Sequence, residues 1–178
     1  MNLRQGIIIS SMLALLASFT PVAHGQTSQA NDEPAIRFAR VTQTKALAAN
    51  DLDRVVSFWT PDITIRRALG QPLSGVAEAR KVLEPAVPSA IAAAPATPAP
   101  PAIIYQREAV SVTVSSNWPL AYEEGRWSGH SGSVDTPAII GGRYSAQWVK
   151  RGGKWLIRSE VFVALTCVDA ACKFAAAP

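Results

Sequence analysis

The sequence of 178 residues contains only two cysteines and two histidines. One of the histidines, His24, lies in the N-terminal segment, so His130 is the single histidine of the rest of the chain. A metal site built from several histidines is therefore excluded, and the carboxylates show no spacing typical of metal ligands. We expect neither a metal nor a cofactor.

Runs of basic residues are also missing. The formal net charge is only +4, and the 17 lysines and arginines are scattered along the chain. This distribution predicts no nucleic-acid partner, because such partners select clustered positive charge. The sequence has no nucleophile elbow and no phosphate-binding loop, so no motif by itself identifies an activity.

The longest apolar run is short and lies at the N-terminus. It extends from Ile7 to Phe19, follows the basic Arg4, and precedes small residues that end at Gly25. This pattern predicts a signal peptide that is cleaved near Gly25 and is too short for a convincing membrane span. We therefore expect a periplasmic or secreted protein without a membrane partner. Its segments would be a signal peptide (1–25), a flexible N-terminus (26–31), one domain (32–166) and a tail (167–178).

Both cysteines lie in the predicted tail, at Cys167 and Cys172. In an exported protein, two cysteines with four residues between them most simply form one disulfide. We expect this bond within a single chain.

The order of predicted elements indicates an α+β fold. Apolar spacing and capping residues predict helices over 32–49, 52–60 and 76–84, and alternation predicts strands over 63–69, 103–116, 120–128, 141–150 and 155–165. A Pro/Ala-rich stretch, 88–102, has no charge and is read as a surface insertion. Helices followed by a run of antiparallel strands indicate helices packed on one face of a curved sheet.

Three face assignments follow from this pattern. The first helix would bury Ile36, Ala39, Gln43 and Leu47 and place Arg40 elsewhere, and the strand 103–116 would place its valines Val110, Val112 and Val114 on one face. The Gly152-Gly153 turn places Lys150 opposite Trp155, which puts Tyr144 opposite Val161. Arg158, Glu160 and Phe162 then face outward, where we expect a surface or a dimer interface.

The ordered motifs resemble the nuclear-transport-factor-2-like superfamily, which includes SnoaL-like polyketide cyclases and ketosteroid isomerases. The matching stretches cover roughly residues 32–165: Asn50-Asp51-Leu52-Asp53, Phe58-Trp59, Pro61-Asp62, Gly70 and Gly75 before Ala79-Arg80, Gly125-Arg126-Trp127, Gly142-Arg143-Tyr144 with Trp148, and Gly153-Lys154-Trp155. The resemblance implies a cone-shaped roll, whose curved, mainly antiparallel sheet wraps the N-terminal helices and leaves a pocket in its mouth. It also implies a homodimer through the outer sheet face, but no single activity.

Polar residues predicted to face the cone are the candidate site. Glu123 and Tyr144 are the candidate catalytic pair, because a carboxylate beside a tyrosine in an apolar site can serve as an acid or base. The candidate ligand-binding residues are Trp59, Arg67, Trp127, Trp148 and Ser159. Glu123 could instead form a structural ion pair with Arg67 or Arg126, and the tryptophans could be core. His130 lies in a glycine-rich loop, either near the cone mouth or simply exposed.

Two classes of function remain open. The first is a pocket for a small, largely apolar molecule, in a binding protein or in an acid–base enzyme of the isomerase, dehydratase or cyclase type. The second is a non-catalytic interaction or oligomerisation module of the cell envelope, with its cone filled by side chains. We expect the pocket, because Arg67, Glu123 and Tyr144 converge on a face otherwise suited to a solid core.

Overall fold

The structure is a computed structural model that describes residues 30–84, 102–168 and Cys172. The predicted signal peptide, most of the Pro/Ala-rich insertion and most of the tail lie outside the described residues. The described chain has the predicted α+β architecture. No helix in these ranges has the length and apolar character needed to cross a membrane.

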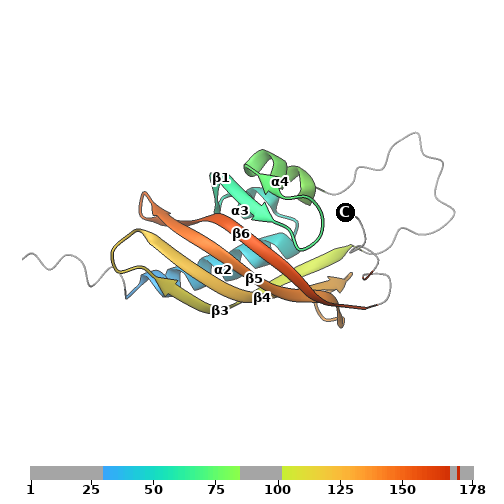
Figure 1. The fold of residues 1–178 in the computed structure, drawn as a ribbon. Helices are drawn as coiled ribbons and strands as arrows, with labels where there is room; N and C mark the ends of the chain where they lie inside the picture. The colour runs from blue at the N-terminus through green and yellow to red at the C-terminus, as the bar shows by residue number, and fades with distance from the viewer. Residues whose placement is uncertain (1–29, 85–101, 169–171, 173–178) are drawn as a thin grey trace, which may run out of the picture.

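One six-stranded sheet organises the fold, with strand order β2-β1-β6-β5-β4-β3. All neighbouring strands are antiparallel except β1 and β6, which run parallel. Figure 1 shows α2 lying along one face of the twisted sheet, called the inner face below. In chain order the elements are α2 (Asp32–Ala48), α3 (Leu52–Val56), β1 (Trp59–Arg66), β2 (Leu73–Ser74), α4 (Val76–Leu83), β3 (Ile103–Val114), β4 (Leu120–Ser131), β5 (Ala138–Arg151) and β6 (Lys154–Cys167).

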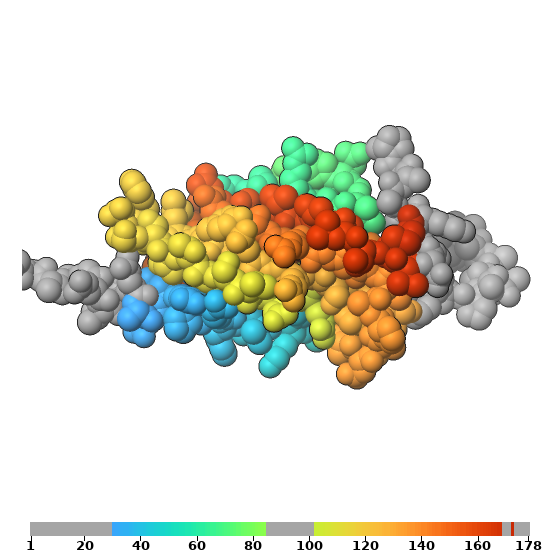
Figure 2. Space-filling view, turned by 60° about the horizontal axis from the view of Figure 1, so that its bottom comes forward, coloured from blue at the N-terminus to red at the C-terminus, as the bar shows by residue number. Residues whose placement is uncertain are grey.

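The long helix α2 buries a mixed polar and apolar face against the sheet. It lies beside β3 along the side of the molecule seen in Figure 2. Ile36, Arg40 and Gln43 are all buried, at the i, i+4 and i+7 spacing of one helix face. The prediction that Arg40 lies elsewhere is therefore wrong, because its charge is compensated by buried carboxylates, as described below.

A β-bulge in the hairpin of β5 and β6 changes the predicted faces. Lys150 lies opposite Trp155 as predicted, but Trp148 pairs with Ile157 and Gln147 with Ser159, which leaves Arg158 as an extra residue. Tyr144 consequently lies opposite Phe162 and not Val161. Because one extra residue reverses the alternation of all later side chains, Glu160 turns inward and Val161 and Val163 turn outward.

Two further sequence predictions need correction at strand level. A bulge between Ala109 and Ser111 turns Val110 to the solvent, whereas Val112 is buried. The second helix ends at Val56, and Trp59 begins β1. The carbonyl oxygen of Phe58 accepts a hydrogen bond from Ile157 N–H. The chain is therefore already paired with β6 just before Trp59, although the apolar spacing there predicts a helix.

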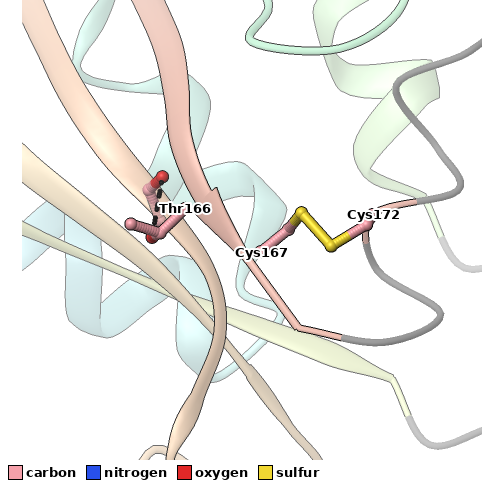
Figure 3. Close-up of a disulfide and its surroundings, with 4 residues drawn as sticks. Thr166, Cys167 and Cys172 are labelled. Carbon is pink, nitrogen blue, oxygen red and sulfur yellow. Dashed lines mark hydrogen bonds between the residues drawn. A yellow bond between two sulfur atoms is a disulfide. The ribbon is translucent and has the colours of Figure 1, made fainter.

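The disulfide between Cys167 and Cys172 is present at the end of β6, as predicted (Figure 3). Within β6, Thr166 Oγ1 donates a hydrogen bond to the Gly141 carbonyl, at 3.4 Å, and so ties this end of the strand to β5. The disulfide thus extends from a strand that is already fixed in the sheet.

Candidate functional site

A pocket of about 380 Å³ lies between the inner face of the sheet and the helices. Its wall is mainly apolar, with four aromatic side chains and two arginines among the lining residues. The lining residues are Leu47, Trp59, Ile65, Arg67, Ala68, Leu69, Leu73, Ala79, Val82, Leu83, Ile103, Tyr105, Arg107, Trp127, Ile140 and Phe162. A concave, mostly apolar site with few polar groups is typical of small-molecule binding.

The structure divides the predicted ligand-binding residues into two groups. Trp59, Arg67 and Trp127 line the pocket. Trp148 is fully buried in the core beside it, and Ser159 is half-buried in the hydrogen-bonded ladder opposite Gln147. The pocket wall therefore includes three of the five predicted ligand-binding residues.

The candidate catalytic carboxylate, Glu123, belongs to a buried ion pair. Arg40 Nε donates to Glu123 Oε1 at 2.9 Å, and Arg40 Nη2 donates to Oε2 at 3.0 Å. The exposed fraction is 1% for the Arg40 side chain and 0% for that of Glu123. A two-pronged pair of this kind fixes both side chains in place.

Two aromatic donors complete the hydrogen bonding of Glu123. The Tyr144 hydroxyl donates to Oε1 at 2.5 Å, and Trp148 Nε1 donates to Oε2 at 2.6 Å. Tyr144 thus lies beside Glu123 as predicted, but the cationic partner is Arg40 and not Arg67 or Arg126. Each carboxylate oxygen has at least two donors, and neither Glu123 nor Tyr144 lines the pocket.

Gly125 makes the position of Tyr144 possible. The two residues lie directly opposite each other on β4 and β5. A Cβ atom on residue 125 would lie only 2.4 Å from Cε1 of the Tyr144 ring, closer than real contacts allow. The glycine of the Gly125-Arg126-Trp127 motif therefore leaves room for the ring that reaches Glu123.

A second carboxylate, Glu160, connects this ion pair to the pocket wall. Arg40 Nη1 donates to Glu160 Oε1 at 2.8 Å and to Gln43 Oε1 at 2.6 Å. Arg107 Nη1 lies 3.3 Å from each of the same two oxygens. We call Arg40, Glu123, Glu160 and Arg107 the charge cluster; Arg107 is its only member that lines the pocket.

The two arginines of the charge cluster differ in how well the protein compensates them. Burial alone would lower the pKa of Arg40, but Glu160 and Glu123 outweigh it and raise that pKa above its ordinary value. Burial lowers the pKa of Arg107. The negative charge of Glu160 opposes this change only in part, and the positive charge of Arg40 lowers the pKa further. Arg107 is thus the less compensated cation.

The tyrosines of the site stay neutral. Burial raises the pKa of Tyr144, and it also raises the pKa of Tyr105, where the nearby positive charge of Arg67 opposes the change. Burial would raise the pKa of Glu160 as well, but Arg107 and Arg40 hold it below the ordinary value. The Trp59 indole also lowers that pKa, although its Nε1 does not reach hydrogen-bond geometry with Glu160.

His130 is held away from the pocket. Its Nδ1 lies 2.6 Å from the Thr136 carbonyl oxygen, and its Nε2 lies 2.8 Å from Ser128 Oγ. Because a carbonyl only accepts, Nδ1 carries the proton, and Nε2 accepts from the serine hydroxyl in the neutral ring. His130 is buried and does not line the pocket, so neither predicted placement, at the cone mouth or exposed, is found.

Sequence reasoning missed Arg40, Arg107 and Glu160. Arg40 could have been found, because it shares a helix face with Ile36 and Gln43. Glu160 could not, because the bulge at Arg158 reverses the alternation that assigned it to the outer face. Arg107 could not either, because regular alternation from the buried Val112 would place it on the opposite face, and only the bulge at Val110 turns it inward.

Comparisons with known proteins identify the fold but no family and no activity. No known family model matches the chain, and no curated protein sequence matches it. Among solved structures, it is similar to a nuclear transport factor 2-like protein with a cystatin-like fold from Novosphingobium aromaticivorans. The TM-score is 0.63 at 11% identity, over 84% of this chain and 92% of that one.

Two other solved structures are similar at comparable levels. A candidate scytalone dehydratase from Novosphingobium aromaticivorans has a TM-score of 0.59 at 15% identity, over 82% of this chain and 94% of that one. A nuclear transport factor 2-like protein of unknown function from Shewanella oneidensis has a TM-score of 0.52 at 16% identity, over 73% and 97%. The chain therefore has the nuclear-transport-factor-2-like fold that its ordered motifs resemble.

Proposed function

We propose that the protein binds a small, largely apolar molecule in the pocket between α2, α4 and the inner sheet face. The observation that carries this proposal is the pocket of about 380 Å³ with a mainly apolar wall, directly beside a buried charge cluster. The alternative function, a non-catalytic interaction module, assumes that side chains fill the cone. A filled cone would leave no space of this size. The similarity to a candidate scytalone dehydratase adds support for a ligand-binding use of this fold.

Binding has better support than acid–base catalysis by Glu123 and Tyr144. Both residues lie behind the pocket wall, and both oxygens of Glu123 are occupied by donors. A group that transfers protons must come within hydrogen-bond distance of the substrate. We therefore assign Glu123 and Tyr144 the role of supporting the pocket.

The proposal is tested with N-phenyl-1-naphthylamine, an uncharged apolar probe that fluoresces when it leaves water. We expect saturable binding with one site per chain. Ala68→Phe adds a ring to a residue of the pocket wall and should weaken binding at least about tenfold, since overfilled sites reject ligands. Ala77→Phe on the exposed side of α4 is the control and should leave the affinity unchanged. Absence of saturable binding to the folded protein would refute the pocket proposal.

We also propose export and dimerisation. Export is supported by the N-terminal pattern of Arg4, the apolar run and the small residues before Gly25, and by a disulfide, which persists in oxidising compartments.

A homodimer through the outer sheet face is supported by its exposed apolar side chains, which include Val110, Tyr122, Val161 and Val163.

A further inference from the structure

Two arginines reach the pocket wall with guanidinium groups whose hydrogen bonding within the described chain is absent or incomplete. Arg67 forms no hydrogen bond and no ion pair with any residue of the described chain. In Arg107, only Nη1 has hydrogen-bond partners there, at 3.3 Å, while Nε and Nη2 have none. The Arg107 side chain is nevertheless only 12% exposed. A cation that is largely desolvated and incompletely paired attracts an anion strongly.

The two arginines line the same pocket. Arg67 is close enough to Tyr105 for its charge to act on the tyrosine hydroxyl. Tyr105 and Arg107 are alternate residues of β3, both in the pocket wall. An anionic group in this pocket therefore has two guanidinium groups in the wall with which it can interact.

The charges around the pocket do not balance. In the charge cluster, the cations of Arg40 and Arg107 are matched by the carboxylates of Glu123 and Glu160. Tyr144 and Tyr105 carry no charge at neutral pH, and burial raises their pKa further above it. Arg67 therefore adds, at the exposed side of the wall, one positive charge that has no ion-pair partner in the described chain.

The rest of the wall suits an apolar body. Trp127 lies beside Phe162 in an edge-to-face arrangement, with ring centroids 6.3 Å apart, and beside Tyr105 at 6.1 Å. Trp59, Ile65 and Leu73 supply further apolar surface. A wall of this kind selects ligands by their shape and by the apolar area that they bury. A small hydrophilic anion would gain little binding free energy from it.

We propose that the ligand is an organic acid, with one anionic group held by Arg107 and Arg67 and an aromatic or aliphatic body against Trp127, Phe162 and Trp59. This inference rests on the proposed function, because it names the ligand class for the same pocket. It adds what that proposal leaves open, namely the charge of the ligand and the residues that select it.

The test compares two probes that differ in one group. 8-Anilinonaphthalene-1-sulfonate carries a sulfonate on the skeleton of N-phenyl-1-naphthylamine. The measured quantity is the ratio of the two dissociation constants, obtained by fluorescence titration of the same protein sample. Because the apolar skeleton is shared, the ratio isolates what the pocket contributes to binding the negative charge.

Arg107→Gln should shift this ratio against the sulfonate probe by at least about tenfold, since a charge-assisted hydrogen bond is lost. Arg107→Lys keeps the charge and should lose less. Arg67→Gln should shift the ratio in the same direction, and more strongly at low salt, because Arg67 is exposed and its charge is screened. Arg66→Gln is the matched control, since it removes an exposed neighbouring charge outside the pocket wall and should leave the ratio unchanged.

The outcomes separate this inference from the proposed function. If both probes bind but Arg67→Gln and Arg107→Gln leave the ratio unchanged, the acid-binding inference is overturned while the apolar pocket stands. If neither probe binds the wild type, the proposed function is overturned and the inference falls with it. Far-UV circular dichroism verifies folding of each variant; should Arg107→Gln unfold, an unchanged ratio in the exposed Arg67→Gln variant still overturns the inference.

Discussion

Glu123 and Glu124 are neighbours on β4 with opposite surroundings. Glu123 is fully buried and accepts hydrogen bonds from Arg40, Tyr144 and Trp148. Glu124 is exposed, and its contact is a 3.4 Å hydrogen bond from Ser111. The pair therefore provides an internal comparison of a buried and an exposed glutamate within one strand.

We expect Glu123→Gln to lower the free energy of unfolding by about 3–5 kcal/mol, because it leaves the Arg40 guanidinium buried with only part of its compensation. The sequence left Glu123 either as a catalytic carboxylate or as half of a structural ion pair, and the hydrogen bonds from Arg40 to both oxygens support the ion pair. Urea unfolding at neutral pH measures the change, and Glu124→Gln should stay within about 0.5 kcal/mol of wild type. Equal stabilities of the two variants would contradict the role of the ion pair.

At the scale of elements, the bulge at Arg158 decides which side chains serve the pocket and which face outward. It places Phe162 in the pocket wall and leaves Val161 and Val163 with exposed fractions of 44% and 51%. The dimer contact expected from sequence is therefore wrong for Glu160, which is only 1% exposed, and for Phe162, which lies in the pocket wall, whereas Arg158 is exposed as expected.

For a dimer through the outer face, Val163→Lys should shift the mass measured by light scattering towards the monomer, since it places an ammonium group in an apolar contact. Phe162→Lys is the informative counterpart. It changes a pocket residue and should weaken binding of N-phenyl-1-naphthylamine while leaving the dimer intact. A monomeric wild type, or a dimer insensitive to Val163→Lys, would count against this interface.

Helices and strands were predictable from the sequence where the local residue pattern alone determines the structure. The hairpin turn at Gly152-Gly153 and the pairing of Lys150 with Trp155 follow from local turn chemistry, and the structure confirms them. It was not predictable which side chains after Val110 and Arg158 face inward. One extra residue in a strand reverses the direction of every later side chain, and the pattern of apolar and polar residues does not show where that extra residue lies. Trp59 and Arg67 were placed at the pocket correctly, whereas the partner of Glu123 lies on a helix 83 positions earlier in the chain.

At the scale of the whole molecule, the disulfide Cys167–Cys172 is a local addition to a finished sheet. It closes a short loop after the last strand, so its loss should lower the free energy of unfolding modestly, on the order of 2 kcal/mol. Reductant should destabilise the wild type by this amount and leave a variant with Cys167→Ser and Cys172→Ser unchanged. Thiol titration of the unreduced, denatured protein should find no free thiol, and two reactive thiols per chain would disprove the bond.

The position of β6 within the sheet determines when folding can be completed. This last strand lies between β1 and β5, and it supplies Glu160 to the charge cluster. During synthesis, β3, β4 and β5 can form a meander, but β1 and β2 have no neighbour in that sheet until residues 154–167 are available. The pocket wall, which draws on all six strands, is therefore among the last parts of the domain to form during synthesis.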